Sequence, residues 1–181
     1  MPTLESATPR TVQRQVVVGL VLAAIVVALG FGVRWWTHPS VFGDGGFDFR
    51  ALPQPVAHSA RDLQVTFSAD EEPVTLAGVE PVWADNTARA TVAFSVCRGD
   101  SHRLAIGAPA GDAEIVCDPL RPVVEGTRID PRQEYVVATI TPTAAGVARL
   151  VGVRLTYATG ARHLFQRGTE VMHLDATVVA R

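Results

Sequence analysis

Lysine is absent from this chain of 181 residues, so all 16 basic side chains are arginines. The arginines are interspersed with 18 acidic residues, and the formal net charge is −2. No part of the sequence is basic enough to build a phosphate-binding surface, which argues against a nucleic-acid partner. The chain is also rich in Ala, Gly, Pro and Val. Together with the missing lysine, this composition is typical of codon bias in a high-GC bacterial genome.

Cysteine is scarce, because Cys97 and Cys117 are the only two. Neither has a histidine or a further cysteine at ligand spacing, which argues against a zinc site. In an oxidising compartment the simplest expectation is one disulfide between them. The loop that it closes would contribute roughly 3 kcal/mol by restricting the unfolded chain. Two buried free thiols are the alternative.

Motifs that carry catalysis are also missing. The five histidines are scattered along the chain, without an HExxH pair or a ligand cluster, and the serines lack a nucleophile-elbow context. These histidines are His38, His58, His102, His163 and His173. The acidic run Asp70–Glu72 stands before Pro73, where a turn between strands explains it. The sequence therefore predicts a protein that is not an enzyme and that has no metal or cofactor.

Two short motifs invite a functional interpretation that their context does not support. The segment Gly43–Gly46, GDGG, is neither preceded by a strand nor followed by a regular series of carboxylates, so turn chemistry explains it better than phosphate or calcium binding. The segment Arg98–Ser101, RGDS, resembles the adhesive sequence that integrins recognise. A chain rich in Arg and Gly is prone to contain this tripeptide by chance, and Gly-Asp is ordinary in turns.

One long apolar run dominates the N-terminal part of the chain. Val16–Val33 contains no charged, amide or proline residue. At about 1.5 Å per residue, this helix would be roughly 27 Å long, close to the thickness of the hydrocarbon core of a bilayer. Arg10 and Arg14 precede it, and positive charge before a first span keeps that end in the cytoplasm. We therefore expect one transmembrane helix, with the rest of the chain outside the cytoplasm.

The residues that follow the run distinguish a retained anchor from a cleaved signal peptide. Arg34, Trp35 and Trp36 suit the membrane interface, and the apolar run exceeds the roughly 7–15 residues of a signal-peptide core. An uncleaved signal anchor is therefore favoured, with cleavage as the alternative. No cysteine lies near the end of the run, which excludes lipoprotein processing.

Small residues recur at every fourth position within the apolar run, at Ala24, Ala28 and Gly32. This spacing lets two helices approach closely. It makes this face a candidate contact surface, either for a homodimer or for docking on a larger membrane complex. Ordinary span composition is the other explanation.

The rest of the chain divides at about residue 60. We expect a short cytoplasmic N-terminus at 1–15, the anchor at 16–36, a Gly- and Pro-rich linker at 37–60, and an extracytoplasmic domain at 61–181. Apolar residues alternate with polar ones in that domain, which predicts short β-strands. The predicted strands are 63–67, 74–79, 90–96, 114–117, 135–141, 148–157, 162–166 and 170–179. The fold class is therefore mainly β, an antiparallel sandwich preceded by one transmembrane helix.

The most distinct local feature is a hairpin, VGVRLTYATGARHLFQ, in which Ala158–Ala161 supplies the turn, with Gly160 able to take a left-handed conformation, and Leu164 begins the return strand. The surrounding run Pro142–Gly168 resembles the C-terminal part of immunoglobulin-like sandwich domains in membrane-anchored proteins of high-GC bacteria. The resemblance implies an immunoglobulin-like fold and no catalytic residues. Antibody-type domains place a tryptophan between their two cysteines, whereas Trp83 precedes both cysteines here.

These features predict a function in binding at the cell envelope. We expect a single-pass plasma-membrane protein whose extracytoplasmic domain binds another membrane or envelope protein or has a structural role there. The alternative is an accessory subunit of a multi-subunit membrane enzyme or transporter, docked through its transmembrane helix. The expected partners are the lipid bilayer and another envelope protein.

Overall fold

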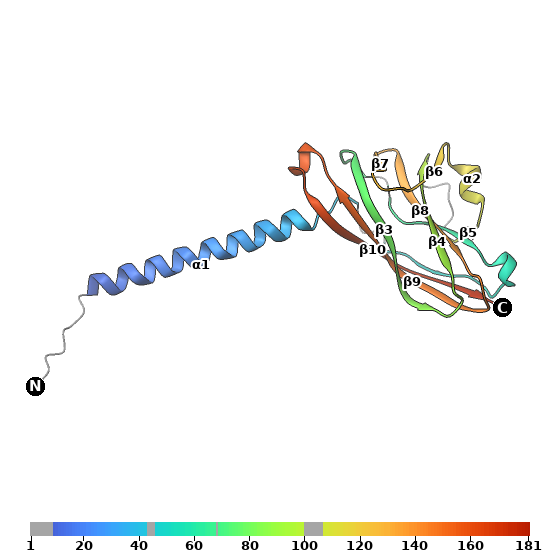
Figure 1. Cartoon of the computed structure of the whole chain (residues 1–181), viewed down its shortest axis with the longest axis horizontal. Helices are drawn as coiled ribbons and strands as arrows, with labels where there is room; N and C mark the ends of the chain where they lie inside the picture. Colours follow the sequence, from blue (N-terminus) through green and yellow to red (C-terminus); the bar gives the residue numbers. More distant parts are fainter. Residues whose placement is uncertain (1–8, 43–45, 68, 100–106) are drawn as a thin grey trace, which may run out of the picture. The chain divides into compact units, whose positions relative to one another are not determined.

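A computed structural model describes residues 9–42, 46–67, 69–99 and 107–181. The chain divides after Thr37 into two compact units, a helical one and a β-rich one that runs from His38 to Arg181 (Figure 1). Each unit is described by itself.

The apolar run forms one continuous α-helix, α1, from Pro9 to Thr37. Its segment Gln13–Thr37 is long and apolar enough to span a membrane, and no part of the most apolar stretch is buried against protein. The Thr37 hydroxyl donates to the carbonyl of Val33 at 2.9 Å, which satisfies one of the open carbonyls at the end of the helix.

The described part of the second unit forms two five-stranded sheets. The strands of sheet A lie in the order β1 (Asp48–Arg50), β10 (Arg167–Ala180), β9 (Gly146–Ala158), β3 (Val74–Asn86) and β7 (Arg128–Ile129). The strands of sheet B lie in the order β5 (Ala108–Pro109), β2 (Arg61–Gln64), β8 (Glu134–Thr141), β4 (Thr91–Arg98) and β6 (Leu120–Pro122). The described residues of this unit also form three short helices: η1 (Val56–His58), α2 (Asp112–Val116) and η2 (Ala161–His163).

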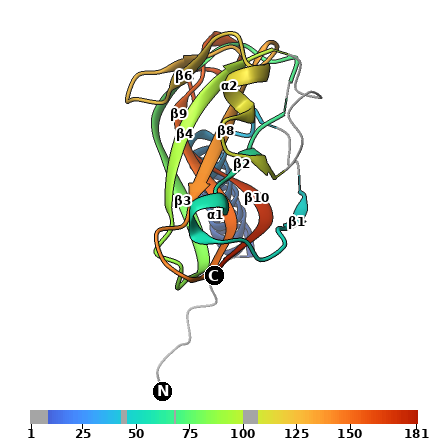
Figure 2. The same ribbon diagram turned by 90° about the vertical axis from the view of Figure 1, so that its right-hand side faces the viewer.

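The main core lies between the two sheets, as the alternation of apolar residues predicts. Leu76 of β3 and Leu150 and Leu155 of β9 face it from sheet A, and Val96 of β4 and Ile140 of β8 face it from sheet B; all five are fully buried. Figure 2 shows the two layers with the domain viewed from its end. The prediction of a mainly β sandwich after one N-terminal helix is therefore confirmed.

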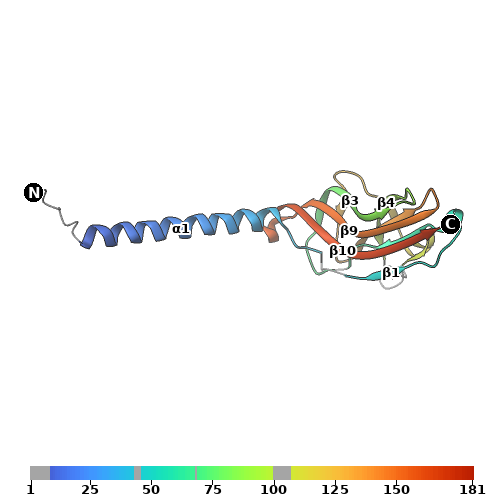
Figure 3. The same cartoon turned by 90° about the horizontal axis from the view of Figure 1, so that it is seen from below.

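One strand pair departs from the expected antiparallel arrangement. β1 runs parallel to β10, with Phe49 opposite Ala176, and it lies at the edge of sheet A beside β10 (Figure 3). Beyond β1, the backbone N–H of Gln54 donates to the carbonyl of Val179. The segment from Phe47 to Val56 therefore follows the second half of β10 to the end of the chain.

The segment 37–60 thus does not behave as the expected linker. Val41 and Phe42 are 3% and 1% exposed and belong to the main core, and the compact unit begins at His38. Burial of these two side chains favours a fixed segment over a flexible one. The residues between them and Gly46 lie outside the described part of the chain.

Two predicted strands are wrong. Residues 114–117 belong mainly to helix α2, which follows Gly111 in a left-handed conformation. Residues 162–166 form part of η2 and the loop after it, and β10 begins at Arg167, opposite Ala158. Gly160, which is able to take a left-handed conformation, has φ −92°, and the left-handed residues of this turn are Leu164 and Phe165.

The outer edge of β3 is open over most of its length in the described residues. β7 pairs only with Val74 and Thr75, while β3 continues to Asn86. Pro81 lies in this open part, and the register shifts on both sides of Trp83. Proline and bulges at an edge discourage another strand from pairing with it. This edge is therefore not suited to binding a partner by strand addition.

Candidate functional site

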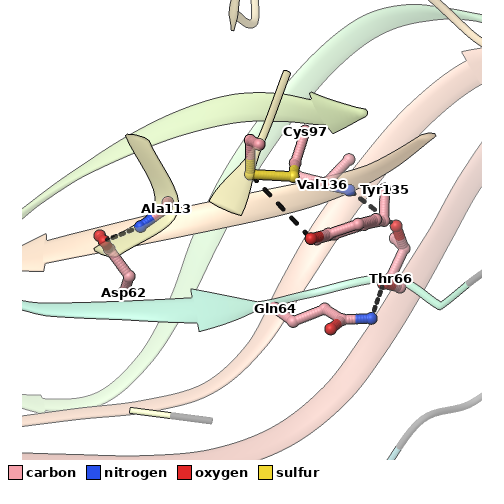
Figure 4. The surroundings of a disulfide bond; sticks show 8 residues. Asp62, Gln64, Thr66, Cys97, Ala113, Tyr135 and Val136 are labelled. Atoms are coloured by element: carbon pink, nitrogen blue, oxygen red, sulfur yellow. Dashed lines mark hydrogen bonds between the residues drawn. A yellow bond between two sulfur atoms is a disulfide. The ribbon is translucent and has the colours of Figure 1, made fainter. Parts of the chain in front are cut away.

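The predicted disulfide is present between Cys97 at the end of β4 and Cys117 just after α2. The two Cα atoms are 5.1 Å apart, and both residues are buried. A second, smaller core surrounds the bond and includes Tyr135 and Val137 of β8 and Ala113 of α2. Figure 4 shows Tyr135 beside the disulfide. The disulfide therefore holds the excursion between β4 and β6 on the outer face of sheet B.

The buried carboxylate of Asp62 also binds the segment between β4 and β6, at the start of α2. Asp62 of β2 is 1% exposed; one carboxylate oxygen accepts from the N–H groups of Gly111 and Ala113, at 2.9 and 3.1 Å. Its other oxygen accepts from the Thr139 hydroxyl at 2.7 Å. Three hydrogen bonds satisfy a buried carboxylate. The group has a structural role, and no open polar atom is left for a ligand.

A different set of polar contacts is gathered at the loop between β9 and β10, which we call the β9–β10 loop (Thr159–Gln166). The acidic run before β3 reaches this loop. Glu71 accepts from the His163 ring at 2.8 Å and lies 3.7 Å from the Arg162 guanidinium. Glu72 accepts from the His163 backbone N–H at 3.0 Å. The acidic run thus holds the loop in place, which a simple turn would not do.

The environment of Glu72 shows how closely it is held by the loop backbone. Desolvation alone would raise the pKa of this carboxyl. Hydrogen bonds from the backbone at His163, Arg162 and Gly160 outweigh that effect, and together with the nearby His163 ring they hold the pKa below its usual value. Glu72 is therefore ionised at neutral pH and bound to the loop backbone.

A second contact ties the start of the domain to the same two strands. The Tyr157 hydroxyl of β9 accepts from the backbone N–H of Val41 at 3.0 Å and donates to the Glu170 carboxylate of β10. Glu170 also accepts from the N–H of Phe42, and the Phe42 ring meets the Tyr157 ring edge to face at 5.4 Å. We call this group of four residues the Tyr157 clamp.

Tyr157 stays protonated in the clamp over a wide range of pH. Burial raises the pKa of its hydroxyl well above the usual range, and the hydrogen bond to the Glu170 carboxylate and its negative charge raise it further. The hydroxyl is therefore a fixed hydrogen-bond donor and not an acid–base catalyst.

The tip of the β9–β10 loop exposes two large apolar side chains next to each other. Leu164 and Phe165 are 59% and 62% exposed. Both have left-handed backbones, with φ of 51° and 56°. This conformation is unfavourable for bulky side chains and is a known mark of functional loops. The loop is closed at its base, where Thr159 N–H donates to the carbonyl of Gln166 at 2.9 Å.

An open groove of about 410 Å³ lies on the same half of sheet A. Its lining includes small residues of three strands, among them Ala77, Thr156 and Gly168, with Glu125 and Arg167 also contributing. The groove has no cluster of acid, base and nucleophile. Its shape and lining do not specify a ligand.

The residues described contain no group of three or more His, Cys, Asp or Glu side chains that could hold a metal ion. His58 follows β1 in η1, His163 lies in the β9–β10 loop and His173 lies on β10. His102 falls outside the described residues, as do Asp100 and Ser101 of the RGDS motif and most of the GDGG segment. The absence of enzyme activity and of cofactors stays a prediction.

The other predicted site residues lie on α1. Ala24, Ala28 and Gly32 are exposed along the helix, as are Trp35 and Trp36 near its C-terminal end. The two indole rings lie 6.5 Å apart. Arg34 is the basic residue of the last turn. Their assignment to a helix contact and to the membrane interface stays a prediction.

The sequence predicted the disulfide but missed the two features that distinguish the β9–β10 end of the domain. The Tyr157 clamp joins residues more than a hundred positions apart, which no local pattern reveals. The adjacent apolar residues Leu164 and Phe165, flanked by His163 and Gln166, are a visible signal, but their pattern also fits the return strand of a hairpin. Comparison with known proteins adds no assignment, because neither a protein-family model nor a curated protein matches this chain.

Proposed function

We propose that this protein is a single-pass, membrane-anchored module of a bacterial cell envelope, which binds another envelope protein through its extracytoplasmic sandwich and catalyses no reaction. Arg10 and Arg14 before the helix support a cytoplasmic N-terminus. Trp35 and Trp36 support an uncleaved helix whose far end lies at the membrane interface. The resemblance of Pro142–Gly168 to immunoglobulin-like domains of membrane-anchored proteins in high-GC bacteria agrees with this proposal.

The observation that carries the proposal is the short tether between anchor and sandwich. α1 ends at Thr37, and the Tyr157 clamp binds the backbone of Val41, four residues later. Four residues span at most about 14 Å. The sandwich therefore stays at the membrane surface, where its partners would also have to be. Asp62 and the disulfide stabilise the domain.

Three exposed apolar side chains on separate parts of the sandwich offer positions at which to test for a protein partner. Leu52, Ile115 and Val124 are 78%, 82% and 63% exposed. A photo-crosslinking amino acid at each position, in the full chain in intact cells, should give a discrete adduct of higher mass from at least one of them. The matched control is Arg154, which lies on the outer face of β9 and pairs with Glu80 at 3.2 Å.

The control position should give no adduct, because a charged surface of paired residues is ordinary solvated protein surface. Absence of adducts at all three apolar positions would contradict protein binding. Protease treatment from outside the cell should digest the sandwich but spare the N-terminus. Protection of the sandwich would contradict the proposed orientation.

A second candidate function rests on α1 itself. Ala24, Ala28 and Gly32 are spaced for close helix packing, and none of them is covered in this chain. In this alternative the chain is an accessory subunit that docks through the helix into a membrane enzyme or transporter. Replacing Val16–Val33 with an unrelated span should then abolish assembly, whereas binding through the sandwich tolerates the replacement.

A further inference from the structure

We propose that the tip of the β9–β10 loop, Leu164 and Phe165, inserts into the interfacial layer of the bilayer that holds α1. The occupant of this apolar surface is lipid, and the contact is a second attachment of the sandwich to the membrane in addition to the helix. This inference rests on the membrane anchoring in the proposed function and adds a lipid-binding surface to it.

The first argument is the way in which the loop presents these two side chains. Both are more than half exposed, although their neighbour Gln166 is 2% exposed. Both hold a left-handed backbone that large apolar residues avoid, and that Gly or Asn would adopt at lower cost. A loop selected for stability alone would have a small or polar residue at these positions. Adjacent exposed apolar side chains on a strained loop indicate a contact outside the domain.

The second argument is the short tether, which identifies the bilayer as the nearest apolar phase. Tyr157 holds the backbone of Val41 and lies two residues before the β9–β10 loop. The loop therefore starts at the end of the sandwich that receives the chain from α1. The loop and the C-terminal end of β10 lie at opposite ends of the sandwich (Figures 1 and 3).

The third argument is the charge of the loop. Residues 159–167, TGARHLFQR, contain Arg162, His163 and Arg167 and no acidic residue. Glu71 pairs with Arg162 and His163 and orients them beside the tip. Arg167 is exposed at the start of β10. Glu71 and Glu72 offset the charges of Arg162 and His163, so Arg167 is the exposed cation of the loop for which the described residues show no ion pair. An exposed arginine close to exposed apolar side chains suits a surface of lipid phosphates over acyl chains.

The tether also removes the need for a strong contact. A loop held close to the bilayer meets it at a high effective concentration, so two side chains suffice where a free domain would need more. A fixed loop loses little conformational freedom on binding. The contacts from Glu71 and Glu72 supply this rigidity before the lipid is met.

The test uses the full chain in lipid nanodiscs with zwitterionic and anionic lipids, and trifluoromethyl-phenylalanine in place of Phe165. Spin-labelled lipids should broaden the fluorine signal at position 165 several-fold more than at a matched position. A water-soluble gadolinium chelate should broaden it less. The matched position is Leu52, an exposed apolar residue beside the C-terminal half of β10.

The inference would be overturned if spin-labelled lipids broadened the fluorine signals at positions 165 and 52 equally. It would also be overturned if the gadolinium chelate broadened the signal at 165 more than the signal at 52. In that case the apolar pair faces water in the absence of a protein partner. Replacing Leu164 with Asn in the labelled protein should reduce the effect of lipid at position 165, and Asn suits the left-handed backbone, so the fold is kept. An unchanged lipid effect in this variant would also count against insertion.

A separate experiment tests whether α1 anchors the protein in the membrane. In it, the same protein in liposomes is treated with alkaline carbonate, which extracts proteins that do not span the bilayer. If the chain resists extraction and position 165 is exposed to water, the lipid contact is wrong and the anchor stands. If the chain is extracted, the anchor and the inference that rests on it both fall.

Discussion

The β3–β4 turn and the β9–β10 loop use the same unusual backbone for different purposes. In the turn, Arg89 has φ 49°, and Asn86 brackets it by accepting from the N–H of Ala90 and donating to the carbonyl of Ala90. In the loop, Leu164 and Phe165 share that conformation but expose apolar side chains. The turn has a polar residue at its strained position and is compact. The loop places large apolar residues there, which stability alone does not explain.

The largest effect is expected from replacing one glycine in each region with alanine and comparing the losses in the free energy of unfolding. Gly146 has φ +148°, and a Cβ there would lie 2.8 Å from backbone atoms of Thr87 and Ala88. Gly146→Ala should therefore lower the free energy of unfolding by about 3 kcal/mol. Gly160→Ala should cost less, about 1–2 kcal/mol, because its backbone is extended and a new Cβ, 2.5 Å from the Glu72 carboxylate, would displace only that group from its hydrogen bonds to the loop. Urea unfolding of the full chain in nanodiscs, followed by the change in tryptophan fluorescence, compares the two variants. Equal losses would contradict this description.

The next effect concerns the Tyr157 clamp. Tyr157→Phe removes the hydrogen bonds to Val41 and Glu170 and should cost about 1–2 kcal/mol. It should also change the dependence of stability on pH. In the unfolded chain this hydroxyl ionises near pH 10, whereas its pKa in the folded protein is higher, so the folded state binds more protons above pH 10.

Stability from Tyr157 is therefore complete below pH 10 and is lost as pH rises above it. The wild type should lose stability between pH 10 and 11.5 more steeply than Tyr157→Phe does, in the same unfolding experiment. Parallel curves for the two proteins would show that the hydroxyl is not held in the protonated form.

The smallest effect is expected from replacing the left-handed residues Arg89 and Phe165 themselves. Arg89→Asn and Phe165→Asn should each relieve the left-handed backbone, with a gain of at most about 1 kcal/mol in the free energy of unfolding. The gain for Phe165→Asn should be the smaller in nanodiscs, because this variant also loses the proposed lipid contact. Leu52→Asn, at an exposed position, is the control and should change stability by less than about 0.5 kcal/mol. A loss above 1 kcal/mol for Phe165→Asn would mean that the ring packs on protein.

The sequence was sufficient wherever the pattern is local. An unbroken apolar run predicted α1, and alternation predicted most of the long strands, because each of these signals lies within one element. Cys97 and Cys117 were the only two candidates for a disulfide. The short elements were harder to predict. β1 has three residues, too few for a period, and it exists because β10 offers an edge more than a hundred residues away.

The errors in the candidate site have the same origin. Helix α2 forms at 112–116 because Asp62 accepts two N–H groups at its start and Cys117 is fixed at its end. The β9–β10 loop was assigned to a strand because Leu164 and Phe165 resemble the apolar residues of a strand. Its conformation depends on Glu71 and Glu72, about ninety residues earlier in the chain. Tertiary contacts of this kind override local preference.

The central claim is that the Tyr157 clamp fixes Val41 and Phe42 to the sandwich, so that only residues 38–40 separate the end of α1 from the clamp. Hydrogen exchange of the backbone amides of Val41 and Phe42, in the full chain in nanodiscs, tests this claim directly. Both amides donate to clamp side chains, so they should exchange at rates similar to the amides of β9 and slow down together with them. Exchange at the rate of an unstructured peptide would contradict the account.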